Sequence, residues 1–197
     1  MKDPILFDFP TQFETDRLLI RMPIPGDGRA VYDAITASLS ELKPWMPFAQ
    51  NEQSMEDVEK NIREAHIDFI KREDLRLLIF LKDTNQLVAS SGLHRIDWDV
   101  RRFEIGYWID SRFSGHGYIT EAVKGIENFA ITELNARRLE IRCEPENVKS
   151  RAVAERLGYS LEGILRKDAL SADSEELRDT CVYGKVVDKE TKGIAHA

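Results

Sequence analysis

The sequence lacks the features that mark secreted, membrane-spanning and metal-binding proteins. It has only two cysteines and four histidines among 197 residues, and these form no cluster with metal-ligand spacing. No apolar run approaches the roughly 18 residues of a membrane-spanning helix. Residues 1–12 contain no basic segment followed by an apolar one, as a secretory signal would. We therefore expect a cytoplasmic protein with reduced thiols, no membrane association and no metal.

Positive charge is also scarce. The chain has 28 lysines and arginines against 35 acidic residues, a formal net charge of −7. Such a balance argues against direct nucleic-acid binding over the whole surface, whereas an amine-bearing acceptor would meet a favourable field. Apolar residues make up 42% of the chain, enough to bury the core of one ordinary domain.

Hydrophobic periodicity predicts one α/β (α+β) domain over residues 1–187, followed by a flexible tail at 188–197. Strands are expected at residues 16–23, 75–81, 87–96, 101–110, 137–144, 160–165 and 177–187. Helices are expected at residues 29–39, 54–69, 118–134 and 148–157. The pattern thus indicates a mixed sheet of about seven strands with about four helices, and residues 1–15 read as a loose lead-in.

Cap residues support three of these helices. Asp27 is expected to cap the helix that follows it. Ser54 and Asp57 have the spacing of a capping box at the start of the next helix. Gly158 stands where a helix would end in a left-handed residue.

The most informative segment is Arg112–Gly117, with the sequence Arg-Phe-Ser-Gly-His-Gly, between a predicted strand and a predicted helix. Two glycines allow a tight turn and close approach of the backbone to a ligand. The following helix begins with unpaired N–H groups and partial positive charge, which suit a pyrophosphate. Alone, so short a motif is more often an ordinary strand–helix turn.

The loop resembles the Arg/Gln-x-x-Gly-x-Gly/Ala motif of the GNAT superfamily of N-acetyltransferases, and further segments match that superfamily in order. These are 15–21, the strand 104–109, the Asn-x-x-Ser segment at 147–150 with Leu157-Gly158-Tyr159, and the hairpin residues 162–166, Asp179 and Tyr183. The resemblance covers residues 15–187 and is nearest to the Rim-type ribosomal-protein N-terminal acetyltransferases. That group carries a Trp-Leu-Pro-like segment where this chain has Trp45-Met46-Pro47.

The resemblance implies a mostly antiparallel GNAT sheet whose fourth and fifth strands splay apart, with acetyl-CoA in the gap as cosubstrate. A free N–H of the splayed strand would bind the thioester oxygen as an oxyanion donor. The residues implied to bind acetyl-CoA are Tyr107, Trp108, Ile109, Arg112, Phe113, Ser114, Gly115, His116, Gly117, Tyr118, Asn147 and Ser150.

Two residues are predicted to be catalytic. Glu104 is the candidate general base for an acceptor ammonium, with Asp168 or water alone as alternatives. The competing interpretation of Glu104 is a solvated carboxylate paired with Arg101 or Arg102. Ser150 is the candidate acid for the departing thiolate, although many GNAT enzymes use a tyrosine on this helix.

The acceptor is expected to contact Trp45, Met46, Phe48, His94 and Glu104. The leading prediction is acetylation of a protein N-terminus, such as that of a ribosomal protein, by direct attack in a ternary complex. A small amine, an antibiotic or an aminoacyl nucleotide is the alternative acceptor, and a non-catalytic CoA sensor is the alternative class. A monomer and a homodimer both stay open.

Overall fold

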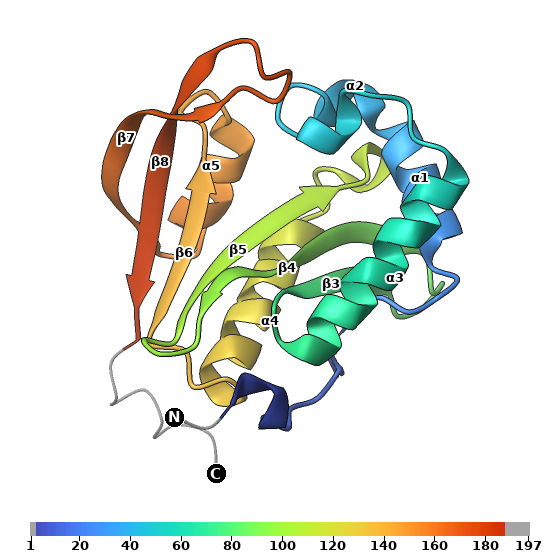
Figure 1. Cartoon of the computed structure of the whole chain (residues 1–197), viewed down its shortest axis with the longest axis horizontal. Helices are drawn as coiled ribbons and strands as arrows, with labels where there is room; N and C mark the ends of the chain where they lie inside the picture. The colour runs from blue at the N-terminus through green and yellow to red at the C-terminus, as the bar shows by residue number, and fades with distance from the viewer. Residues whose placement is uncertain (1–2, 188–197) are drawn as a thin grey trace.

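In the computed structural model, which describes residues 3–187, one eight-stranded sheet runs through the molecule in the order β1-β2-β3-β4-β5-β6-β8-β7 (Figure 1). The strands are β1 Gln12–Glu14, β2 Leu18–Arg21, β3 Leu75–Leu81, β4 Leu87–Asp97, β5 Arg102–Ile109, β6 Arg138–Cys143, β7 Ser160–Leu170 and β8 Leu177–Val186. Every neighbouring pair is antiparallel except β5 and β6. The predicted tail lies outside the described residues.

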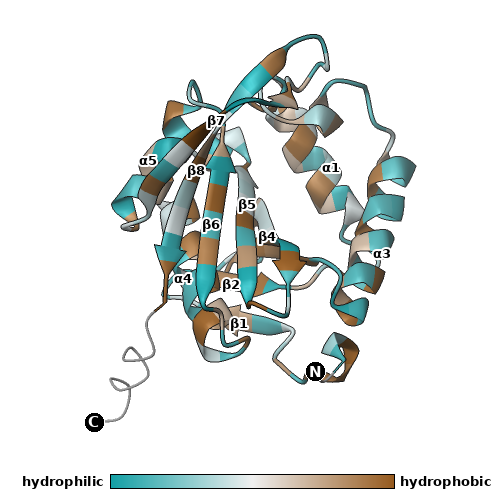
Figure 2. Cartoon of the chain, turned by 60° about the vertical axis from the view of Figure 1, so that its left-hand side comes forward, coloured by the Kyte–Doolittle hydropathy of each residue, from teal (hydrophilic) through white to brown (hydrophobic). Residues whose placement is uncertain are grey.

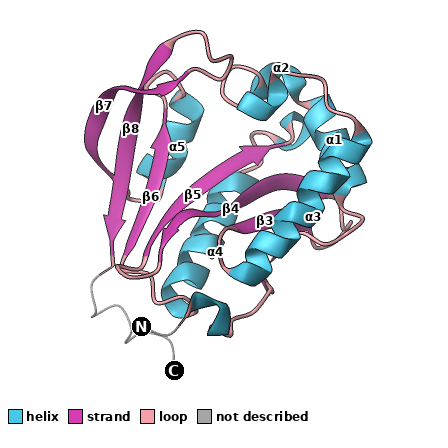
Figure 3. Cartoon of the chain, viewed as in Figure 1, coloured by secondary structure: helices cyan, strands magenta, loops and turns pink. Residues whose placement is uncertain are grey.

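Helices cover both faces of the sheet (Figure 3). They are α1 Gly28–Ala37, α2 Leu39–Leu42, α3 Met55–Lys71, α4 Tyr118–Thr132 and α5 Val148–Arg156, with short 3-10 turns at Pro4–Leu6, Pro47–Ala49 and Ser111–Phe113. Among the described residues, no helix is both long and apolar enough to cross a membrane.

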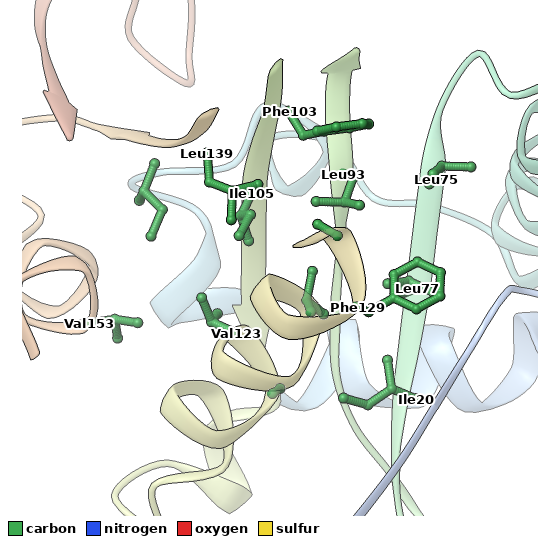
Figure 4. Close-up of a cluster of buried hydrophobic side chains, with 14 of the residues drawn as sticks. Ile20, Leu75, Leu77, Leu93, Phe103, Ile105, Val123, Phe129, Leu139 and Val153 are labelled. Atoms are coloured by element: carbon green, nitrogen blue, oxygen red, sulfur yellow. The ribbon is translucent and has the colours of Figure 1, made fainter. Parts of the chain in front are cut away.

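Two hydrophobic cores follow from the two covered faces. In the larger core, Phe103 and Ile105 of β5 pack with Val123 and Phe129 of α4 (Figure 4). In the smaller core, Trp108 packs with residues of α1 and α3. Successive side chains of a strand point to opposite faces, so β5 contributes to both cores. Figure 2 shows the alternation of apolar and polar residues along the neighbouring strand β6.

The helix α3 forms as predicted. Ser54 Oγ accepts a hydrogen bond from Asp57 N at 3.1 Å, and the Asp57 carboxylate accepts one from Ser54 N at 3.1 Å. Its buried residues are Val58, Ile62, Ala65 and Phe69. This +4, +3, +4 spacing is that of one helix face, and it docks α3 on the sheet.

The predicted fold class is confirmed, with some differences in detail. The lead-in contains β1, which pairs with β2, and the chain after α1 forms the additional helix α2. Asp27 does not cap α1 through its side chain, because its carboxylate binds the Arg21 guanidinium at 2.7 Å. β7 continues through Leu170 across an irregular stretch instead of ending at Leu165.

The strands β5 and β6 diverge soon after they begin. Their parallel pairing covers only the partners of Arg102, Phe103 and Glu104. From Ile105 to Ile109, β5 pairs with β4 on one side and has no described strand on the other. The two strands diverge toward their carboxyl ends, as Figure 1 shows. This is the predicted splay. It was predicted for the fourth and fifth strands, which are β5 and β6 here because the additional strand β1 precedes them.

Candidate active site

The predicted phosphate loop begins with a turn that a buried carboxylate holds in place. Asp110 is fully buried, and its Oδ1 accepts a hydrogen bond from Arg112 N at 3.0 Å. The same carboxylate binds the Arg112 guanidinium at 2.5 Å, while about half of the Arg112 side chain is exposed. The arginine charge is therefore already paired, which orders the loop. Phe113 packs against the larger core.

Both loop glycines adopt a left-handed backbone conformation. The φ angles are +84° at Gly115 and +79° at Gly117, which precedes the first residue of α4. No side chain in the described part of the protein caps this helix end. Among the described residues, the N–H groups from Gly115 to Thr120 donate no hydrogen bond outside helix and strand pairing. Ser114, His116 and both glycines are exposed, so these amides have the arrangement that favours an anion at a helix N-terminus.

An arginine missed at the sequence level anchors this loop from the other end of the chain. Arg17 Nη1 donates to His116 O at 3.1 Å, and Arg17 Nε binds Glu121 of α4 at 2.6 Å. Its guanidinium lies 4.5 Å from the centre of the Tyr118 ring, which stacks on His116. The only signal in the sequence was that Arg17 falls within the segment matching the superfamily.

A hydrogen-bonded bridge crosses the splay between β5 and α5. Tyr107 Oη donates to Ser150 O at 3.0 Å and lies 3.1 Å from Ser150 Oγ. Asn147 caps α5, since its Oδ1 accepts from Ser150 N at 3.1 Å. Burial raises the pKa of Tyr107. The structure thus brings together the predicted acid, Ser150, and two residues predicted to bind the donor.

The side chain of Trp108 points away from this bridge. Trp108 is 9% exposed and belongs to the smaller core, whereas Ile109 packs against the larger one. Because the Trp108 side chain is buried, this residue can offer a donor molecule little beyond its backbone groups, whereas Ile109 is only partly buried.

Glu104 is the last residue of β5 that pairs with β6. Its side chain is 17% exposed, and its carboxylate lies 3.4 Å from Arg95 rather than pairing with Arg101 or Arg102. Burial raises the pKa of Glu104, opposed by the charges of Arg95, Arg142 and His94. A carboxylate with a raised pKa is a stronger base, which suits proton abstraction from an ammonium group.

His94 lies directly across from Glu104 on β4. Its Nδ1 is 2.7 Å from Asp74 Oδ2, which precedes β3. A Cβ added at Gly106 would meet the His94 ring at 3.0 Å, so the imidazole lies over the strand that carries Glu104. The carboxylate of Asp74 orients the imidazole, and sequence reasoning missed it because the two residues are far apart in the chain.

A hollow of about 370 Å³ opens beside Glu104. Its charged lining residues are Arg95, Arg102, Glu104, Glu140, Arg142 and Glu162. Asp168, the alternative base, is exposed on β7 and does not line this hollow. Glu104 is therefore the better placed of the two carboxylates.

The predicted aromatic wall of the acceptor site is largely packed. Met46 and Phe48 contact the smaller core, and the Phe48 ring lies 6.0 Å from that of Trp108. Trp45 is partly exposed, and none of the three lines the hollow beside Glu104. Only Trp45 is free of the described cores.

Neither cysteine shows the environment of a nucleophile. Cys143 is partly buried against the larger core and Cys181 is buried, both as free thiols. Burial raises the pKa of the Cys143 thiol to about 11. The described residues contain no group of histidine, cysteine and carboxylate side chains that could hold a metal ion.

Comparison with known proteins identifies the family. Residues 17–160 match the family model described as "Acetyltransferase (GNAT) domain". The match covers well over half of the chain, which therefore belongs to the GNAT acetyltransferases. The predicted class of enzyme, an N-acetyltransferase, is confirmed.

Relatives extend this result over nearly the whole chain. YdaF of Bacillus subtilis (strain 168), named as a candidate ribosomal N-acetyltransferase, is 32% identical over 90% of this chain and 95% of its own length. The ribosomal-protein-serine acetyltransferase of Escherichia coli (strain K12) is 26% identical over 82% of this chain and 88% of its own.

Solved structures share the fold. The microcin C7 self-immunity acetyltransferase MccE, in complex with acetyl-CoA and AMP, has a TM-score of 0.82 and 25% identity over 91% of this chain and 98% of its own. RimL, a ribosomal L7/L12 α-N-protein acetyltransferase in complex with CoA, has a TM-score of 0.81 and 21% identity over 91% of this chain and 97% of its own.

Proposed function

We propose that this enzyme transfers the acetyl group of acetyl-CoA to the α-amino group of a protein N-terminus, such as that of a ribosomal protein, in the cytoplasm. The observation that carries the proposal is the arrangement along β5. Glu104 stands where β5 and β6 part, and the open amides of the loop 112–117 follow the far end of the same strand. A donor molecule bound along this strand would present its acyl end toward the base.

In this proposal the loop amides and the start of α4 bind the pyrophosphate, and the unpaired edge of β5 binds the pantetheine arm. The Glu104 carboxylate takes a proton from the acceptor ammonium, directly or through water, and the amine then attacks the thioester carbonyl. A backbone N–H of β5 stabilises the developing oxyanion. The Tyr107 hydroxyl donates to Ser150 O and lies 3.1 Å from Ser150 Oγ, so it positions the Ser150 hydroxyl that would protonate the departing thiolate as the C–S bond breaks.

Two comparisons bear on the acceptor. The name of the Escherichia coli relative supports a ribosomal protein, with serine as the acetylated residue. The complex of MccE with acetyl-CoA and AMP supports the second candidate, a small amine that carries a nucleotide. The hollow beside Glu104 is at the small end of ligand sites, and it suits the first residues of a peptide as well as a small amine.

The test is a thiol-release assay with peptides that begin with serine, alanine or methionine, alongside small amines. The matched control is each peptide with a blocked N-terminus and a free lysine. We expect turnover of the free N-termini only, with the added acetyl group located on the α-amino nitrogen by fragmentation mass spectrometry. Acetylation of the lysine side chain or of small amines alone would reject the proposed acceptor.

A further inference from the structure

Within residues 3–187, one charged side chain in the hollow beside Glu104 has no hydrogen-bond or ion-pair partner. Arg142 lies on β6, and its buried Nε finds no hydrogen-bond acceptor. No hydrogen bond or ion pair joins the Arg142 side chain to any other described residue. A buried Nε–H without an acceptor is costly, because it has lost its water without gaining a hydrogen bond in exchange.

The neighbouring acidic residues are engaged elsewhere. Arg138 binds Glu140 at 2.7 Å and also pairs with Glu162. Arg95 lies 3.4 Å from Glu104. Arg102 faces Asp97 at 3.8 Å. Arg142 is therefore the one arginine lining this hollow, within the described part of the chain, that lacks a carboxylate partner.

The position of Arg142 links it to the chemistry. Glu140 pairs with Glu104 across β5 and β6, and Arg142 is two residues further along β6, so it is on the same face. Its charge acts on the Glu104 carboxylate, and both residues line the hollow. An acceptor whose amine reaches Glu104 would place its nearest substituents against Arg142.

We infer that Arg142 is a specificity residue that binds an oxyanion carried by the acceptor close to its reacting amine. This inference rests on the proposed function, which it deepens. A neutral carbonyl would only accept a hydrogen bond from the Nε–H. A carboxylate or phosphate would accept that hydrogen bond and also pair with the positive charge. The first side chains of a peptide are its nearest source of a carboxylate, so the preferred acceptor has aspartate or glutamate as its second or third residue.

The experiment compares two peptides that differ only by aspartate or asparagine at the second residue, and a second such pair for the third residue. Wild-type enzyme should favour one aspartate peptide by about ten- to hundredfold in kcat/KM, the effect of one hydrogen bond to a charged group. Arg142→Met keeps the length of the side chain and should bring the ratio to about one, and any effect of the lost charge on Glu104 is common to both peptides and cancels in the ratio. Its melting temperature should not fall, since the guanidinium makes no hydrogen bond or ion pair with the residues that the structure describes.

Arg102→Met is the matched control, because Arg102 lines the same hollow but faces Asp97. That variant should keep the preference for aspartate. Equal rates on each pair of peptides in wild-type enzyme, or a preference that survives Arg142→Met, would overturn the inference while leaving the proposed function intact.

Phosphoethanolamine and β-alanine extend the test to small acceptors. If they are turned over in an Arg142-dependent manner and no peptide is, the inference stands and the proposed N-terminal acceptor fails. If no amine is turned over, calorimetry of the paired peptides with the CoA-loaded protein makes the same comparison. Equal affinities of the paired peptides there would also overturn the inference.

Discussion

Gly115 and Gly158 form a matched pair for testing the phosphate loop. Their φ angles are +84° and +78°, and a Cβ added at either would meet no atom within 4 Å. An alanine at either position is therefore strained by its backbone alone, at a cost of about 1–2 kcal/mol. Each variant should melt lower by about 2–4 °C per kcal/mol for a chain of this size. Only Gly115 belongs to the loop whose amides are proposed to bind the donor.

The two variants should separate in their affinity for acetyl-CoA. Gly115→Ala relieves its strain by turning the loop, which moves amides away from the pyrophosphate, and one hydrogen bond lost to a charged group costs about 1.5–3 kcal/mol. Calorimetry should then show roughly tenfold weaker binding or worse, with a larger loss for Gly115→Val, whereas Gly158→Ala should bind as wild type does. Unchanged affinity in Gly115→Ala, or equal weakening in both alanine variants, would refute the assignment of the loop.

Three further predictions concern the remaining site residues. Glu104→Gln should lower kcat/KM by roughly 10²–10⁴ and remove the acid limb of the pH profile. Because burial raises the pKa of Glu104, ionisation disfavours the folded state, so the free energy of unfolding of this variant should rise relative to wild type as pH increases through that pKa; a parallel pH dependence of the two would contradict the burial argument. Ser150→Ala should lower kcat by up to about 10² with acetyl-CoA affinity kept, and wild-type kcat where chemistry limits the rate would leave Ser150 without a role as acid. Trp45→Ala should raise the acceptor KM with little change in melting temperature, whereas Phe48→Ala, which loses packing on Trp108, should mainly lower the melting temperature; the reverse pattern would remove Trp45 from the acceptor site.

The parts of the fold that depend on local periodicity were predictable. The helix α3 combines a capping box with an apolar face, and both are properties of neighbouring residues. By contrast, β1 has three residues and forms through its pairing with β2. It is too short for a periodic pattern to predict it. Asp27 has the chemistry of a cap, but the Arg21 guanidinium outcompetes the helix N–H groups for its carboxylate.

The site divides in the same way. The loop around Gly115 is contiguous in the sequence, and its strand–loop–helix context is visible there. The contributions of Arg17, Asp74 and Arg142 depend on contacts between distant parts of the chain or on the absence of a partner. The spacing of residues along the sequence indicates neither such contacts nor a missing partner. They can be recognised only when the register of the strands is known.

The unpaired edge of β5 also bears on how the molecule avoids self-association. A free strand edge ordinarily recruits further strands, including those of other copies of the same chain. Here the exposed groups lie beside β6, and the hydrogen bond from Tyr107 to Ser150 spans the opening. A further strand with side chains on both faces would have to displace that hydrogen bond to pair here, whereas the thinner arm of the donor is the occupant proposed above. The sheet thus keeps unpaired hydrogen-bonding groups in its interior, where a thin ligand can reach them more easily than a further strand can.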